Sequence, residues 1–257
     1  MIEKEGKYIY CIIGTSQERS FGPMGIGGRG DDVMTFGHND LSMVVSSHPI
    51  AKLTVNSDNM LAHERVIETV MKEFDSVLPV RFGTIASNAD EIRRLLDRRY
   101  REFKNALRDS DHKVELGVKG IWKDMDIIFK EVVNDNKAIK NTKEDIQHDK
   151  NKKNIQAKME VGKLVEKALE KKKQKEAESV VDALRRTAFD YKLNKTIGDE
   201  MFVNAAFLVD KGREKEFDNI MNDLGEEHKR RVKFMYAGPL PVFNFVNIVI
   251  YPEEWEK

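Results

Sequence analysis

A chain of 257 residues is long enough for one large domain or two ordinary ones, and it can bury a substantial core. Its 44 basic and 44 acidic residues cancel, which excludes a strong overall field that would draw it to nucleic acid or to an anionic membrane. The single cysteine excludes an internal disulfide, no stretch approaches the ~20 apolar residues of a membrane span, and the charged N-terminus does not resemble a signal peptide, so we expect a cytoplasmic protein.

The first part of the chain mixes strand and helix patterns. Runs rich in β-branched and aromatic residues predict strands at Lys7–Ile13, Val33–Phe36, Leu41–Ser46 and Val77–Phe82. Apolar residues at helical spacing predict helices at Asn59–Phe74, after an N-cap at Asn56 to Asp58, and at Asn88–Leu107. Elements in this order predict an N-terminal α+β domain at residues 1–110.

Residues 111–257 are predicted to form a second domain. Its expected elements are strands at Val114–Trp122, Met201–Val209, Val232–Tyr236 and Phe243–Tyr251, a helix at Arg213–Glu227, and a helical insertion at about 125–193. The order β-α-β-α-β-β suffices for a small ferredoxin-like sheet with helices on one face. The fold class is therefore α+β with two domains, the second of them carrying a helical arm.

The Lys-rich middle of this arm, Asp135 to Glu178, is poor in large apolar residues, so part of it is expected to be mobile. Its 13 lysines exceed its acidic residues by only four (13 against 9), and it holds no aromatic residue. A nucleic-acid interface needs a larger surplus with interleaved aromatic rings. We therefore expect solvated helix faces, with neither nucleic acid nor membrane as a partner.

Residues that can carry chemistry are scattered along the sequence. Gly25 to Gly30 matches G-x-G-x-x-G, but it runs into two aspartates and a predicted strand, where a nucleotide site needs a helix N-terminus. The histidines form no metal-ligand spacing, and Cys11 lies in an apolar strand where a buried thiol is expected. We predict no catalytic residue, no cofactor and no metal.

Arg81 is the one charge inside an apolar segment, L-P-V-R-F-G-T at Leu78 to Thr84. A guanidinium buried there must be paired. An internal ion pair is the favoured interpretation, and the alternative is recognition of an acidic group on a partner.

Six segments together carry a family resemblance. They are K-Y-I-Y-C-I-I-G, the helix with His63 and Glu68, L-P-V-R-F-G-T, K-V-E-L-G-V-K-G-I-W, M-F-V-N-A-A-F-L-V and G-P-L-P-V-F-N-F-V. In this order, and over nearly the whole chain, the sequence resembles the gas vesicle protein F/L family. One departure is that Leu240 follows Pro239 where the family usually has Trp, with Val242-Phe243 after Pro241 in place of Pro-Tyr.

The resemblance implies a non-enzymatic accessory protein required for gas vesicle assembly. It implies binding of the small hydrophobic shell protein and of other accessory proteins, and it carries over no catalytic residue. The residues proposed for partner binding are Arg81, Phe82, Pro239, Leu240, Pro241, Phe243 and Phe245. The alternative function is a small-molecule or haem-binding enzyme of ferredoxin-like fold.

Overall fold

The computed structural model describes residues 4–51, 53–141 and 155–251 of the chain. The chain divides into two compact units: the first is Met1–Glu115 with Asp210–Gly212 and Gly238–Lys257, and the second is Leu116–Val209 with Arg213–Ala237. The predicted boundary between residues 110 and 111 differs from this division, because it assigns everything after residue 110 to the second domain. The C-terminal segment, expected in the second domain, packs with the first unit because its apolar side chains join that core.

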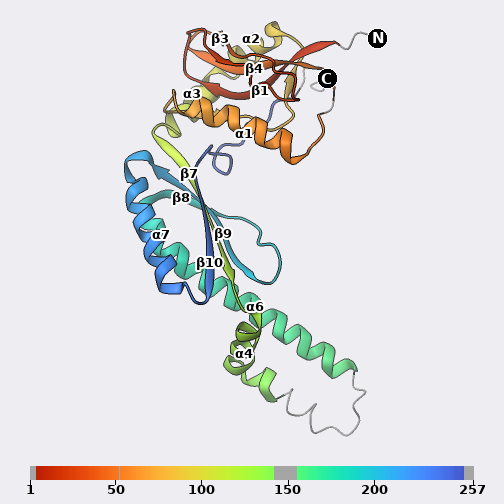
Figure 1. The fold of residues 1–257 in the computed structure, drawn as a ribbon, viewed down its shortest axis with the longest axis vertical. Coiled ribbons are helices and arrows are strands. Elements are labelled where there is room, and N and C mark those ends of the chain that lie inside the picture. The colour runs from red at the N-terminus through yellow and green to blue at the C-terminus, as the bar shows by residue number, and fades with distance from the viewer. Residues whose placement is uncertain (1–3, 52, 142–154, 252–257) are drawn as a thin grey trace. The chain divides into compact units, whose positions relative to one another are not determined.

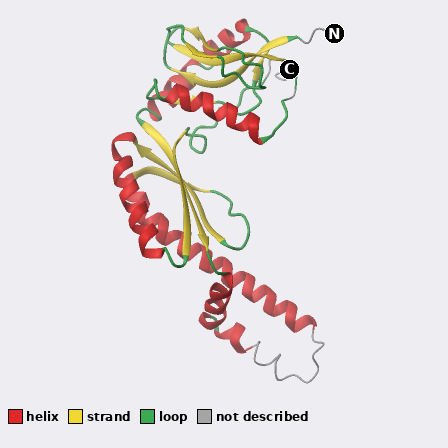
Figure 2. Ribbon diagram, in the orientation of Figure 1, coloured by secondary structure: helices red, strands yellow, loops and turns green. Residues whose placement is uncertain are grey.

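The first unit is built on a six-stranded sheet (Figures 1 and 2). Its strands are β1 (Glu5–Ile13), β2 (Ser20–Gly22), β3 (Val33–His38), β4 (Leu41–Pro49), β5 (Val77–Pro79) and β6 (Ile85–Ala86). The order is β2-β3-β4-β1-β5, with β6 also paired to β1, and the pairs are antiparallel. A tight turn at Asn39 and Asp40 joins β3 to β4, with Asn39 in the left-handed region at φ 55°.

Both faces of this sheet are covered, which explains why β1 is apolar almost throughout rather than alternating. One face packs against helix α1 (Ser57–Met71), through residues such as Val66 and Val70. The other packs against α2 (Ala89–Arg98) and α3 (Tyr100–Asp109), through residues such as Leu96 and Phe103. A central strand buried on two sides loses the period-2 pattern of a half-exposed strand.

The single helix expected at Asn88–Leu107 is wrong in one respect, because the structure breaks it at Arg99. The Arg99 backbone (φ −105°, ψ 18°) leaves the helical region. Its side chain bonds Glu102 and the carbonyl oxygen of Val249. The apolar spacing continues across the break because both helices pack on the same sheet face, so the sequence pattern gives no sign of it.

The second unit is built on a four-stranded sheet in the order β10-β7-β9-β8. Its elements are β7 (Lys113–Trp122), α4 (Met125–Asp135), α6 (Ile155–Leu184), β8 (Ala188–Leu193), β9 (Met201–Asp210), α7 (Glu214–His228) and β10 (Val232–Leu240), with short 3-10 turns at Arg185–Thr187 and Lys211–Arg213. Helix α7 packs on the sheet through Phe217, whose ring contacts Phe207 of β9 and Tyr236 of β10. Figure 1 shows α4 alongside α6.

Two predicted elements of this region are wrong. The helix expected to reach Leu193 ends at Leu184, and Ala188–Leu193 is strand β8, where Phe189, Tyr191 and Leu193 alternate with polar residues. The strand expected at Phe243–Tyr251 is instead a turn, closed by the amides of Phe245 and Val246 on the carbonyl of Val242, followed by a single bridge from Ile248 to Val80.

The predicted Lys-rich arm is helical where the structure describes it, in α4 and in α6. Residues 142–154 of that arm lie outside the described residues.

Candidate partner-binding surfaces

The two segments that carry the sequence motifs meet at a histidine in the first unit. Phe82 follows β5, Phe243 begins the C-terminal turn, and His63 lies on α1 between them. The His63 ring lies 5.7 Å from the Phe82 ring, edge to face, and 6.2 Å from the Phe243 ring. The structure therefore joins Phe82 and Phe243, which are far apart in sequence, around one imidazole.

Hydrogen bonds fix how His63 is held. Its Nε2 lies 3.1 Å from the carbonyl oxygen of Val80, which can only accept, so Nε2 carries the proton. Nδ1 then accepts from the Tyr8 hydroxyl at 2.9 Å, and that hydroxyl in turn accepts from the Gly83 amide at 3.1 Å. His63 thus fastens the loop after β5 onto β1 and α1.

Burial sets the protonation states in this cluster. Desolvation, only partly opposed by the bond to Val80, lowers the pKa of His63 to about 4. Desolvation also raises the pKa of the Tyr8 hydroxyl far above its ordinary value. At neutral pH the cluster is uncharged, so it serves as a scaffold for the aromatic rings.

A buried carboxylate anchors the turn that carries Phe243. Glu115 lies near the start of β7 and is the last residue of the first segment of the first unit. Its side chain is only 4% exposed. Its two oxygens accept from the Asn244 backbone amide at 2.8 Å and from the Asn244 side-chain amide at 2.6 Å. Glu115 is not among the residues proposed for partner binding, because a single carboxylate within a predicted strand gives no sign of its burial.

The other predicted site residues lie in different environments. Arg81 is exposed, Pro239 is exposed and Leu240 is half-buried at the end of β10, while Pro241 is buried and Phe245 is half-buried in the turn. Phe243 is 37% exposed, which is high for an aromatic ring. The surface can therefore offer Phe243 and the edge of Phe82 to an apolar partner, with a cation beside them.

The favoured interpretation of Arg81 as a buried, internally paired charge is wrong. Strand β5 ends at Pro79, and the chain turns at Gly83 (φ 83°), so the in-out alternation of a strand does not extend to Arg81. Among the described residues its guanidinium makes no ion pair, and only its carbonyl is used, by the Thr84 hydroxyl. The side chain is available to a partner's acidic group, which remains a prediction.

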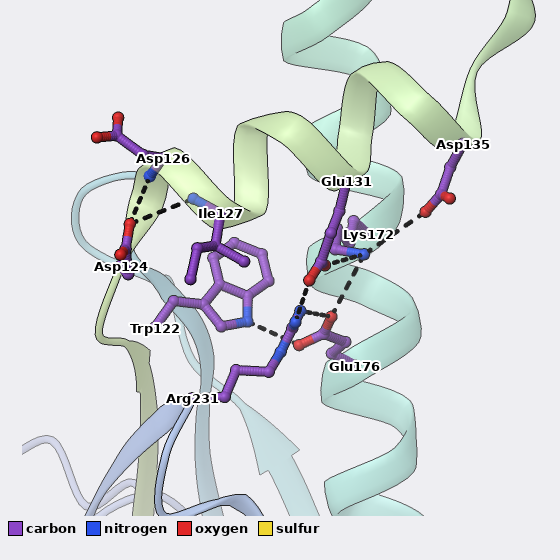
Figure 3. A network of polar contacts seen from close by, with 9 residues as sticks. All are labelled: Trp122, Asp124, Asp126, Ile127, Glu131, Asp135, Lys172, Glu176 and Arg231. Atoms are coloured by element: carbon purple, nitrogen blue, oxygen red, sulfur yellow. Dashed lines mark hydrogen bonds and ion pairs between the residues drawn. The ribbon is translucent and has the colours of Figure 1, made fainter.

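The second unit holds a network of ion pairs that joins residues far apart in the sequence (Figure 3). Arg231, just before β10, donates to Glu131 of α4 at 2.6 Å and to Glu176 of α6 at 2.7 Å. Glu176 also accepts from the Trp122 indole at 2.7 Å, and Lys172 approaches Glu131 at 3.0 Å. Only Lys172 and Glu176, one helical turn apart, are recognisable as a pair from their spacing.

The charged groups of this network stabilise one another in their ionised forms. The Arg231 guanidinium, helped by Lys172, holds the pKa of Glu131 below its usual value, and Glu131 raises the pKa of Arg231 in return. Asp124 caps the start of α4 by accepting from the amides of Asp126 and Ile127 at 3.0 and 3.2 Å. The arrangement positions α4 and α6 on the sheet.

A groove of about 710 Å³ runs between α6 and the β8–β9 hairpin in the second unit. Its walls include Val181 and Ala177 of α6, Tyr191 and Leu193 of β8, and the floor residue Phe202. Charged residues of both signs, among them Glu178 and Arg185, line its rim. The lining therefore mixes apolar side chains with charged and amide side chains.

Cys11, the glycine run and the metal-ligating side chains are the other candidates for a reactive or ligand-binding site. Cys11 is fully buried, as predicted, and desolvation raises the pKa of its thiol. The glycine run leads through a loop into β3, without a helix N-terminus. Across residues 4–51, 53–141 and 155–251, no three His, Cys, Asp or Glu side chains gather closely enough to hold a metal ion. In the same ranges no helix has the length and apolar character needed to cross a bilayer.

Comparison with known proteins gives one family throughout. The model of the family described as gas vesicle synthesis protein GvpL/GvpF matches residues 6–247. Gas vesicle protein F1 of Halobacterium salinarum is 24% identical over 97% of both chains, and gas vesicle protein F of a Streptomyces species is 27% identical over 93% of this chain and 98% of its own.

Solved structures show the same fold. The crystal structure of the gas vesicle protein GvpF from an Anabaena species matches with a TM-score of 0.82 at 21% identity, covering 96% of this chain and 100% of that chain. The GvpF structure from Microcystis aeruginosa matches with a TM-score of 0.80 at 22% identity, over 95% of this chain and 99% of its own. Both carry the mixed α and β architecture described above.

Proposed function

The chain belongs to the gas vesicle synthesis protein GvpL/GvpF family, and from this premise we propose that it is a non-enzymatic accessory factor that binds the hydrophobic shell protein during gas vesicle assembly. The match over residues 6–247 is the observation that carries the proposal. A role in gas vesicle assembly follows from the family, and we place the protein in the cytoplasm and at the gas vesicle. Contact with the shell protein and with further accessory proteins is the part that needs an experiment.

The aromatic surface of the first unit supports this proposal. A small hydrophobic shell subunit has to be held before it polymerises, which requires an apolar surface on its binder. Phe243 presents its ring to solvent and is fixed from beneath by His63 and by the turn that Glu115 anchors. Arg81 adds a cation that can pair with an acidic residue of the partner.

We further infer two domains, the second of ferredoxin-like class. The element order of the second unit, β7-α6-β8-β9-α7-β10, follows the β-α-β-β-α-β pattern once α4 is counted with the first crossover. The sheet order β10-β7-β9-β8 agrees with this assignment. The fourth strand of the pattern is β10, and the second is β8, which replaces the strand expected at Phe243–Tyr251.

Co-purification with the shell protein tests the proposed function. We expect the intact protein to capture the co-expressed shell protein, and Phe243→Ala to reduce capture about tenfold, since an exposed aromatic anchor commonly contributes over 1 kcal/mol. Met34→Ala is the matched control, because Met34 lies in the same unit and is exposed to the same 37%. Absence of any interaction with vesicle components would count against the proposal, and equal loss in both variants would remove Phe243 from the interface.

A further inference from the structure

Strand β8 forms an unusually apolar sheet edge in the second unit. Within the part of the chain that the structure describes, β8 pairs with β9 alone and ends the sheet. Phe189, Tyr191 and Leu193 are 65%, 37% and 60% exposed. Sheet edges of soluble proteins are usually protected by charge, by proline or by a covering segment, so an apolar edge indicates a surface that another strand covers.

The outward backbone groups of β8 can be assigned from its register. Leu193 lies opposite Ala205, and the Asn194 amide donates to the carbonyl of Asn204 at 2.7 Å. Because hydrogen-bonded positions alternate along an antiparallel pair, the N–H and C=O groups of Leu193 and Tyr191 point away from β9. The Tyr191 amide agrees, since it donates to the Asp190 carboxylate at 2.8 Å.

We propose that two copies of this chain pair antiparallel along β8, about a two-fold axis at Tyr191. In this register Tyr191 faces Tyr191 of the second copy, and their outward amides and carbonyls form a hydrogen-bonded pair. Asp190 lies opposite Lys192, twice by symmetry, and Phe189, which lies in the register shift between Ala188 and Asp190, lies near Leu193 of the second copy. The sequence A-F-D-Y-K-L is thus complementary to itself in apolar contacts and in charge.

The contact is built for weak association. A six-residue edge buries less than the ~1,200 Å² of a standard stable interface. The Asp190 carboxylate must also release the Tyr191 amide before that amide reaches the second copy, and it then pairs with Lys192 across the axis. Dimers are therefore expected at high protein concentration, where the two sheets join into one. This pairing is separate from the shell-protein contact proposed for the first unit.

Charge reversal tests the register. Sedimentation velocity of the full chain over a roughly hundredfold concentration range should show a rising sedimentation coefficient, because dimerisation follows mass action. Asp190→Lys and Lys192→Asp each place like charges opposite each other twice, and each should weaken the dimer about tenfold or more. The double variant Asp190→Lys/Lys192→Asp restores opposite charges and should return the dissociation constant to within about threefold of the original.

Proline substitution tests the backbone contact. Tyr191→Pro removes an amide that points away from β9 together with a ring that lies 6.2 Å from the Phe207 ring, so it is compared with Tyr191→Ala, which removes the ring alone. The two variants should have similar melting temperatures, and only the proline variant should lose the backbone contact of the dimer. Should the proline variant fail to fold, the charge reversals decide the question. A protein that stays monomeric over the whole concentration range, or dimers that the single reversals leave unchanged, would overturn the proposal. Shell-protein capture should be unaffected in the charge variants, which separates this test from that of the proposed function.

Discussion

At the scale of single residues, His63 makes the stability of the first unit depend on pH. Its pKa is about 4 in the folded protein, against ~6.5 in an unfolded chain. Between these values the unfolded chain binds more protons, so stability is full above about pH 6.5 and falls as the pH drops towards 4. The shift corresponds to about 3 kcal/mol of unfolding free energy.

Urea unfolding at pH 7 and at pH 4.5 measures this loss. His63→Gln removes the titrating group, so the difference in unfolding free energy between the two pH values should shrink by about 2 kcal/mol or more. Carboxylates titrate in both proteins and contribute equally to the pH dependence. The contribution of His63 is therefore the difference between the two proteins in their pH-dependent change of unfolding free energy. An identical pH dependence in the two proteins would show that His63 is already solvated in the folded state.

Glu115 gives a second prediction at this scale. Glu115→Gln replaces one acceptor oxygen by an amide that faces one of the two Asn244 donors, which should cost about 1–3 kcal/mol in unfolding free energy. The Asn244 amide should also exchange its hydrogen faster. Glu5→Gln is the control, because Glu5 forms an exposed ion pair with Arg29. Unchanged exchange at Asn244 would mean that other contacts hold the turn.

At the scale of elements, the network around Arg231 joins α4, α6 and the start of β10. Arg231→Ala leaves Glu131 and Glu176 without their main partner, so the unfolding free energy should fall by about 1–2 kcal/mol. Hydrogen exchange should accelerate in α4 and α6 and stay unchanged in the first unit. Arg231→Lys should recover only part of the loss, since one ammonium cannot reproduce the fork to two carboxylates.

Lys229→Ala is the matched control, because its ion pair with Glu226 within the same turn is largely exposed. A change below about 0.5 kcal/mol is expected there. Equal effects of the Arg231 and Lys229 variants would show that the network contributes no more than an ordinary surface pair.

The sequence predicted elements well where one pattern dominated. The strand at Lys7–Ile13 and the helix at Arg213–Glu227 match β1 and α7 closely, because both have strong periodicity. It missed β8, whose short alternating run follows a long helix without a glycine or proline to separate them. Of the site residues, the resemblance named Phe82 and Phe243, but the pairing of both with His63 depends on tertiary contacts that no spacing encodes.

At the scale of the whole molecule, the first unit is discontinuous in sequence. Its core includes Ile248, which is 4% exposed and bridges Val80 of the segment after β5. A fragment of residues 1–115 therefore lacks part of its own core, and we expect it to unfold without a cooperative urea transition. Adding a peptide of residues 238–251 should restore cooperativity, whereas the same peptide with Ile248→Asp should not. A fragment that unfolds cooperatively by itself would contradict this prediction.

The bridge between Val80 and Ile248 also sets the order of events during synthesis. Because a ribosome makes the chain from the N-terminus, every strand of the six-stranded sheet emerges before the residue that completes its core, while the whole of Leu116–Val209 is produced in between. Until residues 238–251 have been made, the core of the nascent first unit therefore lacks the side chain of Ile248. Synthesis of the segment around Ile248, rather than completion of any one helix or strand, is therefore the step that completes the core of this unit.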